Sequence, residues 1–233
     1  MDTDNPLTLD HLKNWTFTGT PLAVLGFPIQ HSISPAMHNA ALAEMAKTHA
    51  AFSDWRYFRF EVNPDDLSKA IKVLHQHKFR GINLTLPHKI IAFQEIDYID
   101  ETARPIGAIN TLSWTPTGYH GFNTDGYGLE HGLREDLQTT LTGANVILIG
   151  AGGAARGAAI EFAQRKCLSL WIGNRTKEKA DALAKDVQAL YHSIPVTTFA
   201  PSAPPVNLPP DTVLINATSA GLKQTDPIPI YLT

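Results

Sequence analysis

The sequence predicts an α/β protein of two domains, each containing a mainly parallel sheet, and three observations carry this prediction. Short apolar runs that suit buried strands alternate with helical segments along most of the chain. A glycine-rich turn joins a strand to a helix at residues 145–165. The length of 233 residues is enough for two modest domains, each with its own core. We expect domains over residues 1–126 and 127–233.

Composition excludes several classes of protein. A hydrophobic content of 43% and a charged content of 18% are typical of a soluble globular protein. The net charge of −3 favours neither nucleic acid nor an anionic membrane as a partner. Cys167 is the one cysteine, which excludes an internal disulfide and fits a cytoplasmic protein. The first 20 residues do not resemble a signal or transit peptide, and no apolar stretch is long enough to span a bilayer.

The first domain opens with a strand at 22–25 and a helix from Pro35 to about Thr48. Ser34 is expected at the N-cap and Pro35 at the first helical position. The hydroxyls of Ser32 and Ser34 also suit a carboxylate, because they lie two residues apart at a helix N-terminus. The pattern alone leaves both roles open.

Two further strand–helix units follow in the first domain. A strand at 57–62 precedes a helix that opens at Asn63 and ends near Phe79, and a strand at 81–84 precedes a helix that starts at Pro87. Consecutive units of this kind imply a largely parallel sheet with right-handed crossovers. Lys89 falls in the first turn of the last helix, as either a surface lysine or a functional group.

A hairpin and a helix complete the first half. The strands at 109–114 and 119–122 flank the turn Thr115-Pro116-Thr117-Gly118. The hairpin leads to a helix that runs from Asp125 to about Leu137. Asp125 is expected as the N-cap of this helix, with a functional role as the alternative.

The second domain contains the pattern G-x-G-x-x-A, formed by Gly150, Gly152 and Ala155. It follows the apolar strand 146–149 and opens a helix at about 154–165. Small residues allow the tight turn, the close approach of a pyrophosphate and helix-on-strand packing. The helix N-terminus then faces the phosphates. With a second strand about 20 residues on, the pattern predicts a Rossmann-type dinucleotide-binding domain.

The end of the second strand, at 168–172, indicates which dinucleotide is bound. NAD-binding domains usually carry an acidic residue there, and this chain has none between Leu168 and Lys177. Arg175 stands in that place, and a guanidinium suits a 2′-phosphate. The alternative is a solvated charge cluster with Thr176 as a helix N-cap. We favour NADP over NAD.

The remaining elements are a helix at 177–191 and strands at 196–199 and 212–215. The last strand ends in a polar loop, Asn216 to Gly221. In open α/β sheets ligands bind at this edge, so the loop is a candidate binding element.

Together these segments resemble the shikimate dehydrogenase family. The segments GFPIQHSISPAMHNAAL, GINLTLPHK, GAINT, GFNTDGYG, GAGGAAR, GNRT and NATSAGL occur in the order of the family, from about Leu22 to Leu222. The resemblance implies reversible NADPH-dependent reduction of 3-dehydroshikimate to shikimate, in the biosynthesis of chorismate and the aromatic amino acids. It also implies an N-terminal substrate domain and a C-terminal NADP-binding domain.

The resemblance also implies roles for single residues. Lys89 and Asp125 would form the catalytic pair. The substrate-binding residues would be Ser32, Ser34, Thr85, Asn110 and Asp125, with Asn83 supporting that wall. The cofactor-binding residues would be Gly150, Ala151, Gly152, Gly153, Ala154, Asn174, Arg175, Thr176, Lys179, Thr218 and Ser219. No metal is implied, since the ten histidines show no metal-ligand spacing.

The chain departs from the family pattern at its end. The family continues past Thr233 with a further strand and a segment whose glutamine binds substrate, so we expect an incomplete second domain, lower stability and slow turnover. Two alternatives stay open: a quinate/shikimate dehydrogenase of broader specificity and, because of the truncation, an inactive truncated binding fragment. A monomer and a homodimer both remain open.

Overall fold

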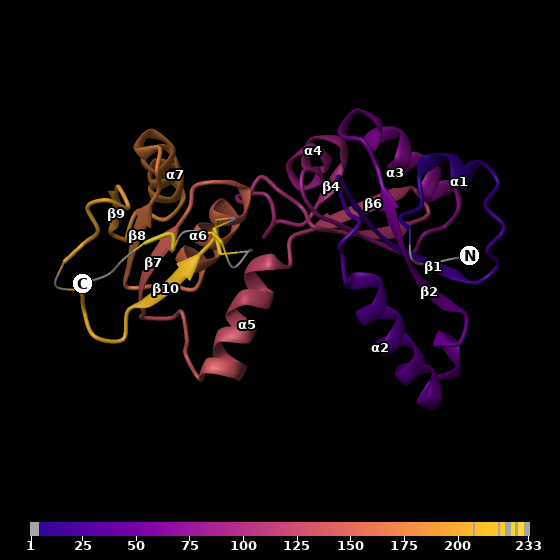
Figure 1. Ribbon diagram of the computed structural model, residues 1–233, viewed down its shortest axis with the longest axis horizontal. Helices are drawn as coiled ribbons and strands as arrows, with labels where there is room; N and C mark the ends of the chain where they lie inside the picture. Colours follow the sequence, from indigo (N-terminus) through magenta and orange to yellow (C-terminus); the bar gives the residue numbers. More distant parts are fainter. Residues whose placement is uncertain (1–4, 207, 219, 222–224, 227, 231–233) are drawn as a thin grey trace. The chain divides into compact units, whose positions relative to one another are not determined.

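The computed structural model describes residues 5–206, 208–218, 220–221, 225–226 and 228–230 (Figure 1). It divides into two compact units, Met1–Asn123 and Thr124–Thr233. Each unit contains its own sheet, as the alternating strand and helix pattern predicts.

The first unit contains a six-stranded mixed sheet with the order β2-β1-β3-β5-β6-β4. Its strands are β1 (Thr20–Gly26), β2 (Trp55–Glu61), β3 (Gly81–Leu84), β4 (Tyr98–Ile99), β5 (Thr111–Thr115) and β6 (Gly118–Phe122). Among these strands only β5 runs against the others, because it is antiparallel to both β3 and β6. The remaining pairs are parallel, which confirms the mainly parallel sheet.

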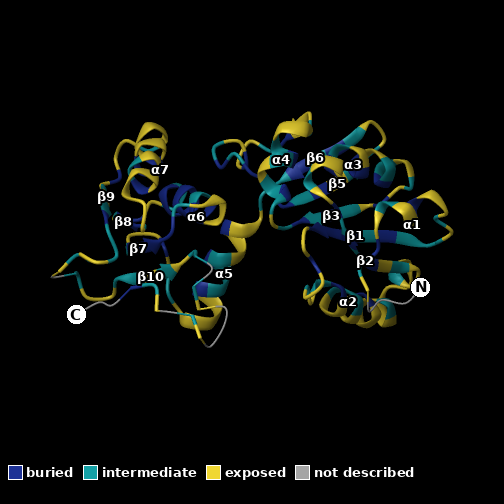
Figure 2. Cartoon of the chain, turned by 45° about the horizontal axis from the view of Figure 1, so that its top comes forward, coloured by how far each residue is buried: buried dark blue, intermediate teal, exposed yellow. Residues whose placement is uncertain are grey.

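Helices cover both faces of this sheet (Figure 1). They are α1 (Leu9–Lys13), α2 (Ser34–Thr48), α3 (Leu67–Gln76) and α4 (His88–Glu95), with 3₁₀ turns at Ala50–Phe52 and Pro64–Asp66. The larger core packs Phe60 and Phe79 against α1, α3 and α4. The smaller core packs Val24 and Tyr57 against Leu42 of α2. Helix α2 is mostly exposed, whereas the strands are mostly buried or half-buried (Figure 2).

The second unit contains a parallel sheet with the order β10-β7-β8-β9. Its elements are α5 (Asp125–Leu137), β7 (Asn145–Ile149), α6 (Gly153–Gln164), β8 (Ser169–Gly173), α7 (Lys177–Leu190), β9 (Val196–Phe199) and β10 (Val213–Asn216). Helix α6 packs against both α5 and α7. The chain continues from β7 to β8 on one side and returns as β10 on the other. The strand order therefore reverses at β7, which is where open α/β sheets bind ligands.

Two predicted helix caps are wrong by one residue. Ile33, not Ser34, is the N-cap of α2, because the carbonyl of Ile33 accepts the first helical hydrogen bond, from Met37 N–H (3.1 Å). Thr124, not Asp125, is the N-cap of α5, because its carbonyl accepts from Gly128 N–H (2.9 Å). Ser34 and Asp125 are the first residues inside their helices.

Other differences are small. The helix expected to end near Phe79 ends at Gln76, and the short elements α1 and β4 carry too little pattern for sequence reasoning to find them. Burial raises the pKa of the Cys167 thiol to about 11, which agrees with a packing role for this side chain. Within the described residues, none of the helices combines the length and the apolar character needed to cross a bilayer.

Candidate active site

A hollow of about 310 Å³ in the first unit collects three of the predicted substrate-binding residues, Ser32, Ser34 and Thr85. It lies where β1 and β3 end, at the loop that leads into α2. Its lining consists of Val24, Pro28, Ile29, Gln30, His31, Ser32, Ser34 and Thr85. Three larger hollows are described in the same unit: those of about 450 and 470 Å³ contain none of the predicted residues, and one of about 380 Å³ contains Ser32.

Thr85 reaches this hollow because the turn after β3 rests on the end of β1. Its amide donates to the carbonyl of Leu25 (2.9 Å), and the amide of Phe27 donates to the carbonyl of Leu86 (3.1 Å). Gly26 permits the contact, since a Cβ there would lie 2.6 Å from Cγ2 of Thr85. Ser32 is tied to the start of α2, where its Oγ accepts a long hydrogen bond from Ser34 N–H (3.4 Å).

Lys89 and Asn110 adjoin this wall through the backbone, although neither lines the hollow. Helix α4 begins four residues after β3, and the carbonyl of Lys89 accepts from the amide of Ile109 (3.0 Å). The carbonyl of Asn110 in turn accepts from the amide of Leu84 (2.8 Å). The start of α4 and the start of β5 are therefore fixed to the end of β3. Lys89 lies in the first turn of α4, as predicted.

His88 lies beside Lys89 and is completely buried. Burial lowers the pKa of this imidazole, although the backbone carbonyls of Val62 and Gly26 act in the opposite direction. A neutral ring at this position adds no charge next to the ammonium of Lys89.

A chain of hydrogen bonds supports the polar wall. The hydroxyl of Tyr57 donates to Oδ1 of Asn83 (2.7 Å), and Nδ2 of Asn83 donates to Oγ1 of Thr111 (3.2 Å). Thr111 then donates to Oδ1 of Asn110 (2.9 Å). Burial raises the pKa of Tyr57, so its hydroxyl stays a donor. Sequence reasoning missed Tyr57, because it looks like an ordinary apolar position of a strand.

In the second unit, the predicted phosphate-binding residues form the turn from β7 into α6. Gly150 has φ +122°, and a Cβ there would lie 2.9 Å from the carbonyl oxygen of Ala217. Gly152 is the N-cap of α6, and a Cβ there would meet no atom within 4 Å. Glycine is thus required by the fold at Gly150, whereas at Gly152 it leaves open space at a helix N-terminus. Ala151, Gly153 and Ala154 belong to the same turn, and this arrangement fits a dinucleotide pyrophosphate.

The loop after β10 lies against this turn. Oδ1 of Asn216 accepts from the amide and the hydroxyl of Thr218 (3.0 and 2.7 Å), and Cγ2 of Thr218 would touch a Cβ at Gly150. The structure thus brings Thr218 next to the glycine-rich turn. Ser219 lies outside the described residues.

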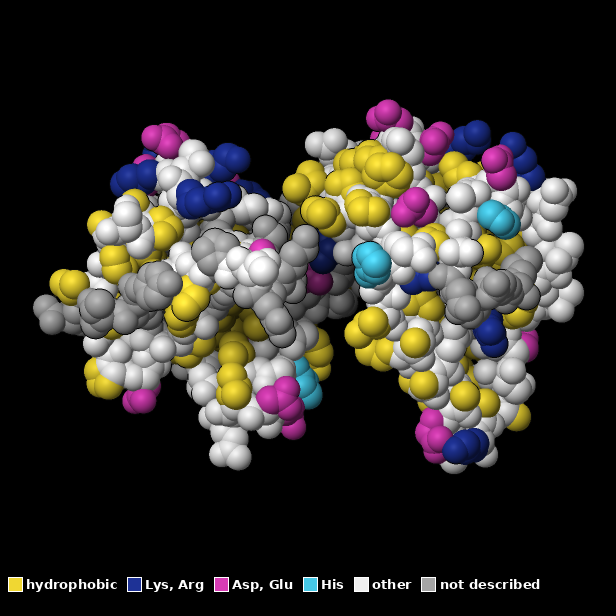
Figure 3. Space-filling model, in the orientation of Figure 1, with side chains coloured by type: hydrophobic (Ala, Val, Ile, Leu, Met, Phe, Trp, Pro, Cys, Tyr) yellow, Lys and Arg dark blue, Asp and Glu magenta, His cyan; other side chains and the backbone are white. Residues whose placement is uncertain are grey.

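Basic side chains gather over α7 (Figure 3). Lys177 bonds both carboxylate oxygens of Asp181 (2.8 and 2.9 Å), and the hydrogen bonds from Lys177 and Thr198 lower the pKa of Asp181. Arg175 and Lys179 are exposed and pair with no carboxylate in the described parts of the chain. These two charges fit an anionic ligand. Asn174 donates to the carbonyl of Thr176 (2.8 Å), the N-cap of α7.

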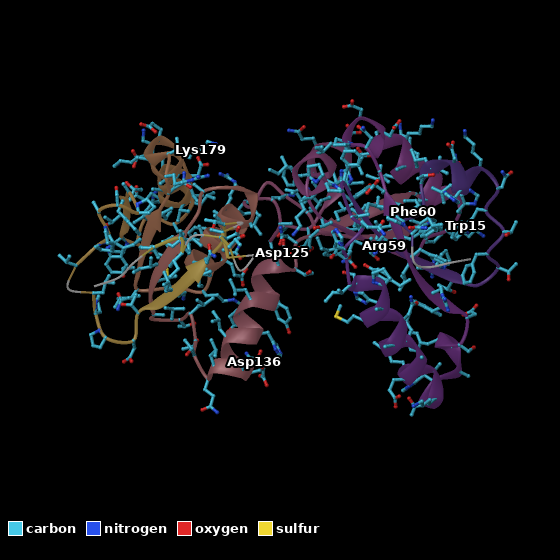
Figure 4. All side chains as sticks on the ribbon, in the orientation of Figure 1. Trp15, Arg59, Phe60, Asp125, Asp136 and Lys179 are labelled. Carbon is cyan, nitrogen blue, oxygen red and sulfur yellow. The ribbon has the colours of Figure 1, made fainter. Side chains whose placement is uncertain are left out.

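Asp125 is exposed at the N-terminal end of α5, and Asp136 lies near the other end (Figure 4). The next residue, Gly126, is buried against α6, where a Cβ would lie 2.7 Å from side-chain atoms of Glu161. Glu161 is itself paired with Arg165 (2.8 Å). Asp125 thus belongs to the second unit, while Lys89 belongs to the first.

Within the described residues, no three His, Cys, Asp or Glu side chains are placed to hold a metal ion.

Two family models match the chain. The model of the shikimate dehydrogenase substrate binding domain matches residues 24–112, and the model of shikimate/quinate 5-dehydrogenase matches residues 133–220. The first match covers most of the six-stranded sheet, and the second covers the glycine-rich turn and the loop after β10.

Named relatives and a solved structure agree with these matches. The chain is 40% identical over 164 residues to a shikimate dehydrogenase (NADP(+)) of Desulforamulus reducens, covering 70% of this chain and 54% of that protein. It is 37% identical over 214 residues to a shikimate dehydrogenase (NADP(+)) of Nitrosopumilus maritimus, covering 90% and 74%. Shikimate 5-dehydrogenase of Thermus thermophilus, solved with NADP(H) and shikimate, superposes with a TM-score of 0.73 at 32% identity, covering 87% and 70%. The chain spans about half the length of some curated relatives, 54% and 55%.

Proposed function

The chain belongs to the shikimate dehydrogenase family, and we propose that it catalyses the reversible NADPH-dependent reduction of 3-dehydroshikimate to shikimate. This reaction belongs to the biosynthesis of chorismate and the aromatic amino acids. The observation that carries the proposal is the hollow that gathers Ser32, Ser34 and Thr85 beside the helix of Lys89. Hydroxyls and one ammonium suit a small polyhydroxy acid.

The first domain, residues 1–126, binds the substrate in this proposal. The hydroxyls of Ser32 and Ser34 hold its carboxylate, at the N-terminus of α2 where the helix dipole favours an anion. The substrate hydroxyls are bound by Thr85, Asn110 and Asp125. Asn110 is nearly buried and belongs to the hydrogen-bonded chain that starts at Tyr57, so its amide is held in one orientation.

Lys89 and Asp125 form the catalytic pair. Reduction of the ketone places negative charge on its oxygen, and Lys89 stabilises that charge and donates the proton. Asp125 orients the ammonium of Lys89 and binds a substrate hydroxyl. Because neutral His88 adds no competing charge, Lys89 supplies the positive charge on this part of α4.

The second domain, residues 127–233, holds NADP, which supplies or accepts the hydride when bound. The residues that would hold its pyrophosphate are Gly150, Ala151, Gly152, Gly153 and Ala154. Asn174, Arg175, Thr176 and Lys179 bind the adenosine 2′-phosphate, because the two exposed cations offer charge and hydrogen bonds there. Thr218 and Ser219 are assigned the role of contacting the nicotinamide end of the cofactor.

The test is a turnover assay with shikimate and NADP, followed by NADPH absorbance. We expect turnover with this pair and much weaker turnover with NAD. Calorimetric titration with shikimate runs in parallel, so that binding is measured independently of chemistry. Binding of shikimate and NADP without turnover would refute the proposed catalytic activity and favour the alternative of an inactive binding fragment.

The second alternative is a quinate/shikimate dehydrogenase of broader specificity, which one of the matching family models also includes. Equal kcat/KM for quinate and shikimate would favour it. We further propose a cytoplasmic enzyme that takes only small-molecule ligands and acts as a monomer or homodimer, a choice that light scattering would decide.

A further inference from the structure

Strand β2 directs alternate side chains to the two faces of the sheet. Phe60 is fully buried in the larger core, where its ring lies 6.1 Å from that of Trp15. Arg59 and Glu61 therefore project from the opposite face, together with Tyr57, which packs against Leu42 of α2 in the smaller core. The loop between β1 and α2 crosses this same face.

Both of these charged side chains bind the backbone of that loop. Oε2 of Glu61 accepts a hydrogen bond from the amide of Ile29 (3.2 Å). Nη1 of Arg59 donates to the carbonyl of Gln30 and to the carbonyl of Ser32 (3.2 Å for Ser32). An acceptor and a donor, two residues apart on one strand, thus hold the two ends of the segment Ile29–Ser32.

The Ile29 side chain also anchors this segment, because it is buried in the smaller core. Gln30 and His31 are exposed, and the backbone bond that closes the segment runs from Ser32 N–H to the carbonyl of Ile29 (3.0 Å). Hydrogen bonds from a buried strand to loop backbone remove conformational freedom that the loop would otherwise have to lose when a ligand binds. The position of the Ser32 hydroxyl depends directly on this backbone.

We infer that Arg59 and Glu61 are positioning residues that fix the Ile29–Ser32 loop and so place Ser32 for the substrate carboxylate. The identity of that carboxylate rests on the proposed function, whereas the bracing of the loop does not. Neither residue touches the substrate in this account, so both act through the backbone that they hold.

The test uses paired variants of similar length. Glu61→Met removes the acceptor, while Glu61→Gln keeps a carbonyl oxygen for Ile29 N–H. Arg59→Met removes the donors, while Arg59→Lys keeps an ammonium that can reach one carbonyl. Arg104→Met is the matched control, because Arg104 is an exposed arginine of the first unit that lines none of the described hollows.

For each Met variant at 59 or 61, we expect KM for shikimate to rise by about 5–30-fold, the scale of one or two hydrogen bonds. The value of kcat should change by less than about 3-fold and KM for NADP should not change, because a loop that binds the carboxylate contributes uniform binding. Glu61→Gln and Arg104→Met should stay near wild type. The double Met variant should lose less than the product of the single effects, since both side chains hold one loop.

Amide hydrogen exchange gives a readout that needs no turnover. The Ile29 amide should exchange about 10-fold faster or more in Glu61→Met and at the wild-type rate in Glu61→Gln. Equal Ile29 exchange in Glu61→Met and wild type would overturn the inference, as would faster exchange with an unchanged KM. If the wild type does not turn over shikimate, the proposed function fails, and Ile29 exchange together with shikimate affinity by calorimetry decides the inference.

Discussion

The two halves of the candidate site are built in different ways. In the first unit, the site residues are held by side chains from distant parts of the sequence, such as Tyr57 on Asn83 and Glu61 on Ile29. In the second unit, the glycine-rich turn is shaped by its own backbone, with Gly150 at φ +122° and the N-cap of α6 two residues later. The first half depends on side-chain hydrogen bonds between distant residues, whereas the second depends on backbone angles and on close backbone contacts, such as that of Gly150 with Ala217.

This difference explains which substitutions each half tolerates. A turn that needs a left-handed backbone angle at a glycine loses stability when a substitution introduces a side chain that disfavours that angle. A site held by several long-range hydrogen bonds loses activity in small steps as single bonds are removed, because each bond fixes only part of the geometry. Four experiments test this contrast.

The largest effect is expected for Lys89→Ala, which removes the proposed proton donor and positive charge. We expect kcat to fall by about 10²–10⁴-fold, with a much smaller change in KM, because this interaction forms mainly in the transition state. NADP binding should persist, since the cofactor residues belong to the second unit. Lys72→Ala, at an exposed lysine of α3, is the control in steady-state kinetics.

Asp125→Asn should also slow turnover, and the double variant with Lys89→Ala should lose less than the product of the two single effects. A near-normal kcat for Lys89→Ala, or fully multiplicative losses, would remove the catalytic pair.

The next effect is expected for Gly150→Ala. A side chain at this positive φ costs about 1–3 kcal/mol of unfolding free energy, and the close approach to the carbonyl of Ala217 adds to it. Gly152→Ser is the matched variant, because its Cβ meets nothing and serine caps helices well. Gly152→Ser should keep its stability within about 0.5 kcal/mol yet bind NADP more weakly. Urea unfolding and NADP titration separate the two, and equal stabilities would contradict the strain at Gly150.

A smaller effect is expected for Arg175→Asp, which replaces the cation proposed to bind the 2′-phosphate with an anion. NADP affinity should weaken by about 1–3 kcal/mol, the scale of a charge-assisted hydrogen bond, and NAD should be relatively favoured. Lys177→Gln is the control, because Lys177 is already bonded to Asp181. An unchanged ratio of kcat/KM for NADP to that for NAD would show that this loop does not select the cofactor.

The smallest effect concerns buried His88. The pKa of His88 is lowered in the folded protein. On acidification the imidazole is therefore protonated near pH 6.5 in the unfolded chain, while it is still neutral in the folded chain. Stability should therefore fall as pH drops below about 6.5, by at most about 1.4 kcal/mol per pH unit for this group. His88→Phe should flatten the slope of unfolding free energy between pH 7 and 5. Burial also lowers the pKa of His38, which is present in both the wild type and His88→Phe. An identical slope in the two proteins would therefore show that His88 does not contribute to the pH dependence of stability.

Sequence patterns predicted most of the fold because most of it is locally encoded. The strands 81–84 and 196–199 match the structure residue for residue, and the apolar face of α3 is buried as its spacing requires. The caps at Ser34 and Asp125 were predicted one residue too late, since serine and aspartate are good caps but the first helical bond starts one residue earlier.

The supports of the site could not be predicted in the same way. Arg59 and Glu61 bind backbone atoms, and their partners lie 27 to 32 residues away, so no motif records them. The catalytic roles of Lys89 and Asp125 came from resemblance, because spacing alone describes a surface lysine and a helix cap equally well. The role of Arg175 was predicted from the missing acidic residue at that strand end, with a solvated charge cluster as the alternative. The structure shows which residues surround these side chains, and the kinetic experiments test the proposed roles.

The contact between Gly126 and Glu161 has a mechanical consequence. At Gly126 the backbone of α5 lies directly on the Glu161 side chain of α6, with no room for a Cβ, one residue from Asp125 in the first turn of α5. Helix α6 also begins at the glycine-rich turn. A larger residue at position 126 would therefore push α5 away from α6, and we expect this shift to move the neighbouring Asp125 carboxylate while leaving the first unit unchanged.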